Sequence, residues 1–450
     1  MVLTSLLENT VLQTISQTEV NTMQNQLIKN VEKRKWITSR TLVVGVDIGC
    51  QFNAVALMKG DGEVLGAPVR VYNSRKGFMY FMELVEGARR RHELGQVVVG
   101  MEPTGHYWRK LAYFAKDRGF EVRFVRTTAL KHQRELDESS SAKSDARDAL
   151  TIGNLVREGK YLDTLVEEGV FRELRTLGKT RERLLRYYSG TLQVLGAVLD
   201  DYFPELKDVF FSMESKGLWA VLERFPFPED VLRTDPGVLE EVIGKATRHR
   251  CKAREKALAI IERARDSVGL TGVSGTERLR VRMYVEELRR MWSKLLEIEQ
   301  EMKRLAAEVP CAKWLCSIPG TGMLSVAAFL GELGDPARFD HYKRIVKFAG
   351  LDPVEQDSGL RVGGKRISKK GRYVLRKFIF YMTMRAVHHS SYFKGEYERR
   401  LATTNRRGRT LAKREALCAI SIKLIKVVFA LLRDGRVFSE KPPALLGQVA

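Results

Sequence analysis

The stretch TLVVGVDIG, residues 41–49, decides the first part of the fold. It is a short valine-rich run with glycine just beyond, which predicts a buried β-strand ending near Asp47. A second such run, QVVVGMEPTG at residues 96–105, carries Glu102 after its apolar part. A carboxylate at the end of a buried strand is costly unless a positive group lies against it. We therefore expect two buried strands that each deliver one acid to a common site.

A third segment, AKSDARDAL at residues 142–150, carries two more acids, Asp145 and Asp148. Helical spacing of three puts both carboxylates on one face with their Cβ atoms roughly 5–6 Å apart. Such close like charges repel, and a divalent cation between them is the usual reason for the pairing. Alternatively, both are solvated helix acids that face Lys143 and Arg147.

Together the four acids predict a metal site. Two strand-end carboxylates and an i, i+3 pair suit two Mg²⁺ ions roughly 3.5–4 Å apart, the arrangement used for phosphoryl transfer. No histidine lies near enough in sequence to favour a softer metal. The predicted metal ligands and candidate catalytic acids are Asp47, Glu102, Asp145 and Asp148.

Strand and helix patterns alternate through residues 41–160. The strand with Asp47 is expected to run on through residues 54–66, where Gly60-Asp61-Gly62 suggests a hairpin turn. A helix at 77–93, the strand with Glu102, a helix at 106–119, a short strand at 121–126 and the Asp145 helix follow. The order of these elements and the positions of the acids predict an α/β domain of the ribonuclease-H type.

The composition points to a polyanion as partner. The chain has 450 residues, of which 44% are hydrophobic and 29% charged, as in folded proteins, but its formal net charge is +22. Nucleic acid is the commonest partner of such a charge excess. Lys423 and Lys426 interrupt the most apolar stretch, so we expect no membrane span. The five cysteines form no zinc-binding pattern, and we expect free thiols in a cytoplasmic protein without a signal peptide.

The remaining chain divides by pattern into a polar N-terminal extension (1–40), a helical region (165–308), a further unit (309–400) and a C-terminal helix with a tail (401–450). Apolar residues recur at alternating spacings of three and four positions through residues 281–305, which is typical of a coiled-coil seam. They are Val281, Tyr284, Leu288, Met291, Leu295, Ile298, Met302 and Leu305. A weaker seam over residues 170–198 is broken by Arg181. The partner helix lies either within one subunit or on another, and the pattern does not distinguish them.

The unit at 309–400 is expected to be mostly α-helical and to contact phosphate. Its IPGTG turn resembles a helix-hairpin-helix, in which Gly320 and Gly322 would let backbone N–H groups approach a phosphate. From Ser358 to Gly395 there is no acid. Uncompensated cations threaded through glycines predict a surface that binds the nucleic-acid backbone. They are Arg361, Lys365, Arg366, Lys369, Lys370, Arg372, Arg376, Lys377 and Arg385.

Ser358 lies between Asp357 and Gly359, in a turn that leads into these cations. A serine hydroxyl attacks only if a base or metal takes its proton, and bound cations lower the charge barrier for attack on phosphate. Most serines in such turns cap helices or satisfy backbone groups instead. The spacing alone therefore leaves both roles open.

Five motifs in order resemble one family over roughly residues 41–400. VGVDIG, MEPTGHYW, AKSDARDA, SIPGTG, and GLDP with DSGLRVGGKRISKKGRYVLR are similar to the DEDD transposases of insertion-sequence family 110, described as bridge-RNA-guided serine recombinases. The resemblance implies a RuvC-like site made of the four acids and a catalytic serine at Ser358. Cys50 and Gln51 depart from the family, which often has a basic residue there.

The resemblance also implies a mechanism and partners. Ser358 would attack a DNA phosphodiester and become covalently linked to the cut strand, while the acids with Mg²⁺ would act at the same composite site, contributed by the same or another subunit. A bridge RNA would select donor and target DNA by base pairing, as in other RNA-guided systems. A homo-oligomer, dimer or tetramer, is expected.

Two other functions remain open from the sequence. One is a RuvC-type metal nuclease that cuts DNA with the four acids and no covalent step. The other is a basic coiled-coil scaffold that binds nucleic acid without catalysis. Substitution of Ser358 would distinguish the nuclease from the recombinase, because only the recombinase needs the serine. Substitution of the acids would distinguish the scaffold from both enzymes, because only the enzymes need the acids.

Overall fold

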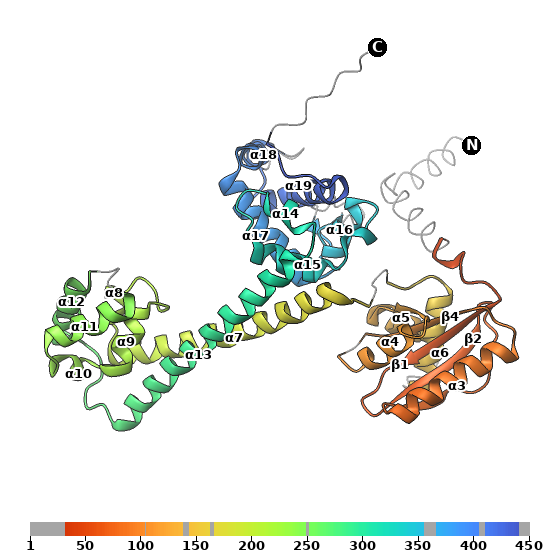
Figure 1. Ribbon diagram of the computed structural model, residues 1–450, viewed down its shortest axis with the longest axis horizontal. Coiled ribbons are helices and arrows are strands. Elements are labelled where there is room, and N and C mark those ends of the chain that lie inside the picture. Colours follow the sequence, from red (N-terminus) through yellow and green to blue (C-terminus); the bar gives the residue numbers. More distant parts are fainter. Residues whose placement is uncertain are drawn as a thin grey trace, which may run out of the picture. The chain divides into compact units, whose positions relative to one another are not determined.

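The structure is a computed structural model that describes residues 32–103, 105–137, 144–162, 166–248, 252–354, 366–404 and 410–440. The chain divides into two compact units, Met1–Val166 and Glu167–Ala450 (Figure 1). Each unit is described by itself. Most of the predicted N-terminal extension, residues 1–31, lies outside the described residues.

The first unit is built on a five-stranded sheet. Its strands are β1 Thr41–Asp47, β2 Phe52–Lys59, β3 Val69–Tyr72, β4 Gln96–Met101 and β5 Glu121–Phe124. Their order is β3-β2-β1-β4-β5, with β1, β4 and β5 parallel and β2 antiparallel to both its neighbours. The predicted mixed α/β domain is confirmed. The helices are α3 Arg75–Arg91, α4 Trp108–Lys116, α5 Thr127–Asp137 and α6 Asp145–Arg157.

Two details of the prediction are wrong. The strand with Asp47 does not run on, because the chain reverses after Asp47 and returns as β2, so the first hairpin turn is at residues 48–51. The Gly60–Gly62 turn exists but leads only to an isolated bridge between Met58 and Val64. Helix α5, between β5 and α6, was not expected, since residues 127–137 carry few apolar side chains.

Helices cover both faces of this sheet (Figure 1). Alternate residues of β1 point to opposite faces, as the strand period requires. Leu42 and Val44 pack with the buried residues of α3 and α4, such as Phe81 and Leu111. Val43 packs on the other face, in a cluster that includes residues of α5 and α6. Helix α6, which carries two of the four acids, is therefore held against the centre of the sheet.

A glycine contact sets how closely α6 approaches β1. A Cβ atom added at Gly45 would lie 2.0 Å from the carbonyl oxygen of Ala149 and 2.7 Å from the nitrogen of Gly153. Both are backbone atoms of the helix and cannot move aside. Only glycine at position 45 allows the strand and the helix to touch at this distance.

Gly45→Ala should therefore destabilise the first unit by about 3 kcal/mol, the upper end of the usual cost of overpacking. Denaturant unfolding of the full chain, followed by circular dichroism, measures this cost. Gly87→Ala on α3 is the matched control, because nothing lies within 4 Å of its added Cβ. The control should be neutral or stabilising by up to about 1 kcal/mol. Equal unfolding midpoints for the two variants would contradict the role of Gly45.

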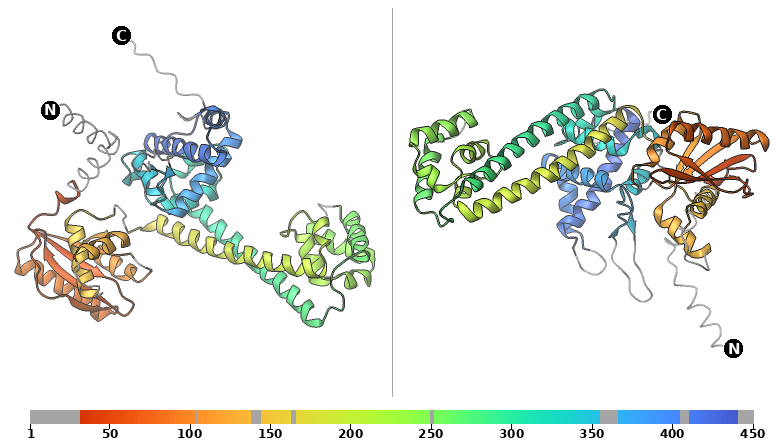
Figure 2. Two further views of the ribbon diagram at one scale, coloured as in Figure 1. Left: turned by 180° about the vertical axis from the view of Figure 1, so that it is seen from behind. Right: turned by 90° about the horizontal axis from the view of Figure 1, so that it is seen from below.

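Two long helices form the centre of the second unit. Helices α7 Gly169–Tyr202 and α13 Gly275–Ala307 pack along each other within one chain (Figure 2). The predicted seam is largely buried, with Val281, Leu288 and Leu295 at most 2% exposed. Arg181, which broke the weaker seam, pairs with Glu299 of α13 at 2.6 Å. Of the two arrangements left open, this structure contains the intramolecular helix pair.

Small helices lie at either end of this pair (Figures 1 and 2). One end carries α8 Leu206–Val209, α9 Lys216–Arg224, α10 Pro228–Leu232, α11 Pro236–Thr247 and α12 Ala253–Arg265. The other end carries α14 Ala312–Cys316, α15 Met323–Leu333, η1 Pro336–Arg338, α16 Tyr342–Ala349, β6 Pro353–Val354, β7 Arg366–Ile367, α17 Tyr373–His389, α18 Ser391–Ala402 and α19 Lys413–Asp434. Each end has its own apolar core.

Among the described helices, none is both long enough and apolar enough to cross a membrane. The thiols of Cys50, Cys311, Cys316 and Cys418 are free, and Cys251, the fifth predicted free thiol, lies outside the described residues. Burial raises the pKa of the Cys311 thiol to about 11, so the free thiol stays protonated at neutral pH.

Candidate functional site

The sheet brings two of the predicted acids to one edge. Asp47 is the last residue of β1, and Glu102 follows β4 directly. The two strands are parallel neighbours with Val46 opposite Met101, so the next residues, Asp47 and Glu102, leave the sheet side by side. Glu102 is 9% exposed. Carboxyl ends of neighbouring parallel strands are a common location for ligand sites in α/β folds.

Helix α6 adds the other two acids in its first turn. Asp145 is exposed, whereas Asp148 is only 2% exposed. Ala149, the residue after Asp148, is the one whose carbonyl touches Gly45 of β1. The glycine contact thus fixes the first turn of α6 against the strand that ends in Asp47.

Asp148 is bound by an arginine that the sequence did not reveal. Arg134, on α5, donates through Nε to Oδ1 and through Nη2 to Oδ2 of Asp148, both at 2.5 Å. Such a bidentate pair has strong directional hydrogen bonds and balances the charge of the buried carboxylate. The cation lies on a helix that has no apolar period, so no pattern pointed to it.

Two asparagines hold the loop that follows Asp47. Asn53, which is 1% exposed, accepts from the Gly49 N–H and donates to the Asn73 side chain at 2.8 Å. Asn73 donates in turn to the carbonyls of Gly49 and Cys50. A hydrogen bond with Cys50 raises the pKa of Tyr107, from the segment after β4. The segments that follow the two acid-bearing strands are therefore in contact. Neither asparagine was predicted.

The donor chemistry of the four acids fits a divalent cation, because all the oxygens are hard ligands. Within the described ranges, however, no three His, Cys, Asp or Glu side chains lie close enough together to hold a metal ion. Asp145 points to solvent, and Asp148 is engaged by Arg134. The fold places Asp47 and Glu102 at one edge with the first turn of α6 against β1, and Arg134 already contacts both carboxylate oxygens of Asp148.

Arg134→Ala should lower stability in EDTA, because it leaves a buried carboxylate unpaired at a cost of about 3 kcal/mol. Added Mg²⁺ should restore part of this loss and should bind roughly tenfold more tightly than to the wild type, since no guanidinium competes for Asp148. Thermal unfolding and calorimetric titration with Mg²⁺ measure the two effects.

Lys131→Ala, on the same helix and with its side chain 75% exposed, is the control for the Arg134 variant. It should leave both the stability and the Mg²⁺ affinity unchanged. Weaker Mg²⁺ binding by Arg134→Ala would mean that Arg134 positions the carboxylate for the metal instead of competing with it.

Ser358, Arg361 and Lys365 lie outside the described residues. The cations that follow them are described, and Arg366, Lys369 and Lys370 are exposed. Lys369 has a positive φ of 54° and starts the turn into α17. These three side chains and exposed Arg385 remain candidates for contact with a phosphate backbone, and the roles of Arg361 and Lys365 stay predictions.

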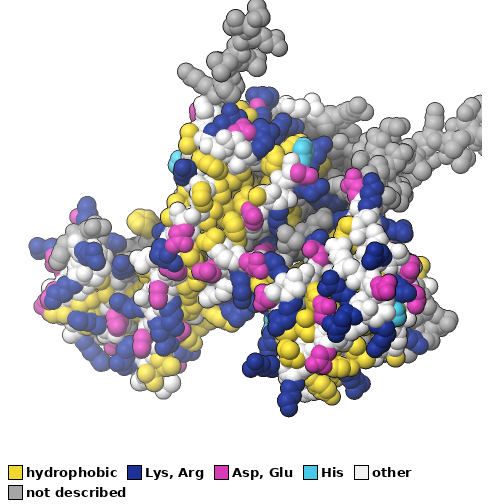
Figure 3. Space-filling model, turned by 45° about the vertical axis from the view of Figure 1, so that its right-hand side comes forward, with side chains coloured by type: hydrophobic (Ala, Val, Ile, Leu, Met, Phe, Trp, Pro, Cys, Tyr) yellow, Lys and Arg dark blue, Asp and Glu magenta, His cyan; other side chains and the backbone are white. Residues whose placement is uncertain are grey.

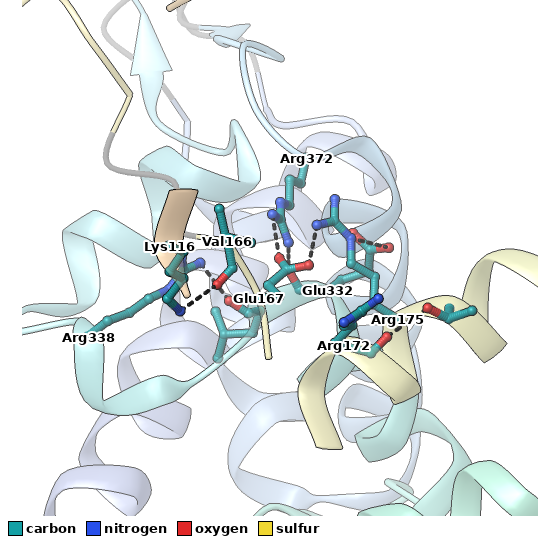
Figure 4. Close-up of polar contacts among 10 residues, drawn as sticks. Lys116, Val166, Glu167, Arg172, Arg175, Glu332, Arg338 and Arg372 are labelled. Carbon is teal, nitrogen blue, oxygen red and sulfur yellow. Dashed lines mark hydrogen bonds and ion pairs between the residues drawn. The ribbon is translucent and has the colours of Figure 1, made fainter. Parts of the chain in front are cut away.

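Arg372 has a different environment from the one predicted. Its guanidinium lies among buried charges and contacts Glu167 at 2.6 Å and the carbonyl of Glu332 at 2.5 Å (Figure 4). Arg175 of α7 also donates to Glu167. Arg376 donates to the carbonyl of Ala349 at 2.7 Å. Both Arg372 and Arg376 are used inside the protein, so the predicted phosphate role is not assigned to them.

Glu167 is the acid at the centre of this buried cluster. Burial alone raises the pKa of its carboxyl, but the Arg372 and Arg175 guanidinium groups outweigh it and hold the pKa below the ordinary value. Burial lowers the pKa of the Arg338 guanidinium to about 10, and Arg372 adds to the effect. Arg338 therefore stays charged at neutral pH, and Glu332 and Asp335 share with Glu167 the balancing of the three arginines.

Glu167→Gln should destabilise the second unit by about 3 kcal/mol, because it removes the anion between buried cations. Since the folded-state pKa of Glu167 is depressed, its contribution is complete above about pH 4.5 and is lost as the pH falls through the folded-state value. Denaturant unfolding at pH 7 and at a pH well below 4.5 should therefore show that the difference in stability between the wild type and the variant shrinks at the lower pH.

Glu301→Gln is the control for Glu167→Gln, since its ion pair with Arg304 is exposed on α13. It should change stability by less than about 1 kcal/mol. A constant difference between Glu167→Gln and the wild type at both pH values would contradict the charge-based role.

The IPGTG turn joins α14 to α15. Gly320 has a φ of 76°, which favours glycine, and its added Cβ would lie 2.7 Å from the His389 ring and 2.9 Å from the Arg385 Cβ. The close approach of Gly320 is therefore to α17. Nothing lies within 4 Å of a Cβ added at Gly322.

Residues 44–204 match the sequence model of the DEDD transposase of IS110, and residues 312–398 match that of the "Transposase IS116/IS110/IS902 family". The chain carries both domains of this transposase type. It thus falls among DNA transposases and recombinases, which are enzymes. The first match contains all four acids, and the second contains the IPGTG turn, Ser358 and α17.

Three relatives illustrate the similarity. An insertion element IS116 protein of 44.8 kDa from Streptomyces clavuligerus is 26% identical over 404 residues, 89% of this chain and 96% of that protein. An insertion element IS110 protein of 43.6 kDa from Streptomyces coelicolor is 24% identical over 73% of this chain and 80% of its own length. The pilin gene-inverting protein of Moraxella bovis is 26% identical over 36% of this chain and 50% of its own length.

Proposed function

We propose that this transposase cuts and rejoins DNA strands through a covalent serine–DNA intermediate formed by Ser358, assisted by a divalent metal held by the four acids. The observation that carries the proposal is the arrangement of the acids: Asp47 and Glu102 end neighbouring parallel strands, and the first turn of α6 is packed against one of them. All four acids lie in the segment that matches the DEDD transposase model.

The covalent step exchanges one phosphorus–oxygen ester bond for another. The Ser358 oxygen forms a bond to phosphorus, the bond from phosphorus to one bridging oxygen of the strand breaks, and that oxygen leaves as a hydroxyl. The serine proton passes to a carboxylate or to water, and the departing oxygen takes a proton from the same group or from water, so that no net proton is gained or lost. Because the phosphate ester is kept, a hydroxyl of another strand can reverse the exchange and release the serine without an external energy source.

Mg²⁺, when bound, would withdraw charge from the phosphate oxygens and lower the pKa of a bound hydroxyl or water. Asp47 and Glu102 would hold it from the strand ends, Asp145 from the exposed start of α6, and Asp148 after release by Arg134. The asparagine-held loop after Asp47 would keep that carboxylate oriented.

The alternative is a RuvC-type nuclease that uses the acids without a covalent step. The pilin gene-inverting relative favours recombination, since inverting a gene requires that cut strands be rejoined. A hydrolysing nuclease releases both ends and keeps no bond energy for rejoining.

We further propose a bridge RNA as the guide and a homo-oligomer as the active form. Lysine and arginine side chains are spread over the face seen in Figure 3 and are not confined to one element. Together with the net charge of +22, this spread suits a protein that holds the backbones of several nucleic-acid strands while base pairing selects the sequence.

Ser358→Ala should abolish both strand transfer and the protein–DNA adduct while leaving DNA binding within about twofold, because the hydroxyl contributes little to backbone affinity. Adducts are detected by denaturing electrophoresis of labelled DNA carrying the element's ends. Asp47→Asn should lower strand transfer by at least about 100-fold and abolish its dependence on Mg²⁺.

Serine 368 supplies a matched control for the Ser358 experiment. It lies ten residues further on, and its hydroxyl bonds to Asp352, so Ser368→Ala should keep the adduct. If Ser358→Ala still cuts DNA at the wild-type rate, the metal nuclease is correct and the covalent proposal is wrong.

A further inference from the structure

Helix α17 exposes a face that its role in the core does not explain. Its inward face packs Leu375, Ile379 and Ala386, each at most 1% exposed, into the core of the second unit. The opposite face exposes Tyr373 by 67%, Tyr381 by 48% and Met384 by 45%. Solvent-facing helix positions normally carry polar side chains, and a row of large exposed apolar groups marks an interaction site.

These side chains form a continuous stripe. At 100° per residue, Tyr373, Met384, Lys377, His388 and Tyr381 fall within an arc of roughly 80°. The rise of the helix separates Tyr373 from Tyr381 by about 12 Å. Successive bases in a stacked strand follow one another about every 3.4 Å, so the two rings meet different bases.

Cations accompany the stripe at both ends. Lys369 and Lys370 precede Tyr373 and are exposed, and Arg385 is exposed beside Met384. No acid occurs in the sequence from Arg366 to Gly395. In the middle, Lys377 lies 5.8 Å from the Tyr381 ring centre, and its charge is balanced by Glu182 of α7 at 2.6 Å. The centre of the stripe is therefore suited to stacking and its ends to phosphate.

We propose that this face of α17 binds an unpaired DNA strand, with bases stacked on Tyr373 and Tyr381 and phosphates held by the flanking lysines and Arg385. Aromatic rings interleaved with cations are the usual construction of single-strand sites. A second copy of the chain is a poorer occupant, because the same face would bring like charges together. DNA is favoured over RNA because the chain is a DNA transposase, and strands must separate next to a cut before they are exchanged.

This site goes beyond the proposed function, since it requires neither Ser358 nor the four acids. Its test is anisotropy of a labelled oligo(dT) strand of about 20 nucleotides with the full chain in EDTA, where no metal-dependent step takes place. Tyr373→Ala and Tyr381→Ala should each weaken binding roughly 5- to 100-fold, the range for loss of one stacked base. Tyr→Phe at either position should stay within about twofold, because the ring is kept.

The controls separate stacking from charge and from folding. Tyr187→Ala removes a tyrosine that is 63% exposed on α7 and should leave the affinity unchanged. Lys369→Ala with Lys370→Ala should flatten the dependence of affinity on salt by about 0.7 units of slope per contact, whereas the tyrosine variants should keep the wild-type slope. Thermal unfolding of each variant should match the wild type, since these side chains are exposed.

Four results would overturn the proposal. They are an unchanged oligo(dT) affinity of both alanine variants, an equal loss with a duplex of the same length, a loss confined to oligo(U), and a change of oligomeric state without a change in oligo(dT) affinity. Because the Ser358→Ala protein must also bind oligo(dT) normally, failure of this site is distinguishable from failure of the proposed reaction.

Discussion

The contact between Gly45 and the backbone of α6 is the constraint on which the acid edge depends. A β-strand and a helix normally stay apart by the thickness of their side chains. Here the strand has no side chain at the crossing, and a Cβ atom would lie 2.0 Å from a helix carbonyl. The helix also has a glycine, Gly153, at the crossing. Its own added Cβ would lie 2.6 Å from Cε of Met58 on β2, the end of a flexible side chain that can move, so the backbone contact at Gly45 is the stricter of the two constraints. This close packing places the first turn of α6, with its two acids, beside the end of β1.

The burial of each acid determines what must compensate its negative charge. Asp145 is exposed and is solvated by water, whereas Asp148 is almost fully buried and requires a counter-charge. The fold supplies Arg134 from α5. A guanidinium or a metal ion could each balance the charge of this buried carboxylate, but only one of them can bind both oxygens of Asp148 at a time. A similar charge balance is found in the second unit. Glu167 pairs with Arg372 and Arg175, which would otherwise repel each other near the N-terminus of α17.

The sequence did not predict β3, whose residues are mostly exposed or half-buried, but it predicted β1 and β4 well because these strands are buried on both faces and read as uninterrupted apolar runs. It also predicted the four acids at strand ends and on one helix. It did not predict α5 or Arg134, since residues 127–137 carry no apolar period and the contact joins segments that are distant in sequence. Asn53 and Asn73 were missed for a similar reason: their role depends on the reversal after Asp47, which the sequence pattern placed elsewhere. Composition alone could not tell which of the predicted phosphate-binding cations are used inside the protein. Arg372 forms an ion pair with Glu167, whereas Lys369 is exposed.

The difference between internally paired and exposed cations determines which of them can attract a nucleic acid to the second unit. An arginine that pairs with an internal carboxylate contributes almost nothing to the field outside, because the pair is neutral at a distance. The effective cations near α17 are therefore those with exposed ends, Lys369, Lys370 and Arg385, and they flank a stripe whose centre is aromatic and electrically balanced. A duplex offers its phosphates but hides the faces of its bases, so it can use only the flanking charges. An unpaired strand can use both the charges and the rings. A face built in this way would therefore distinguish unpaired from paired DNA and not one base sequence from another, as the proposed single-strand site requires.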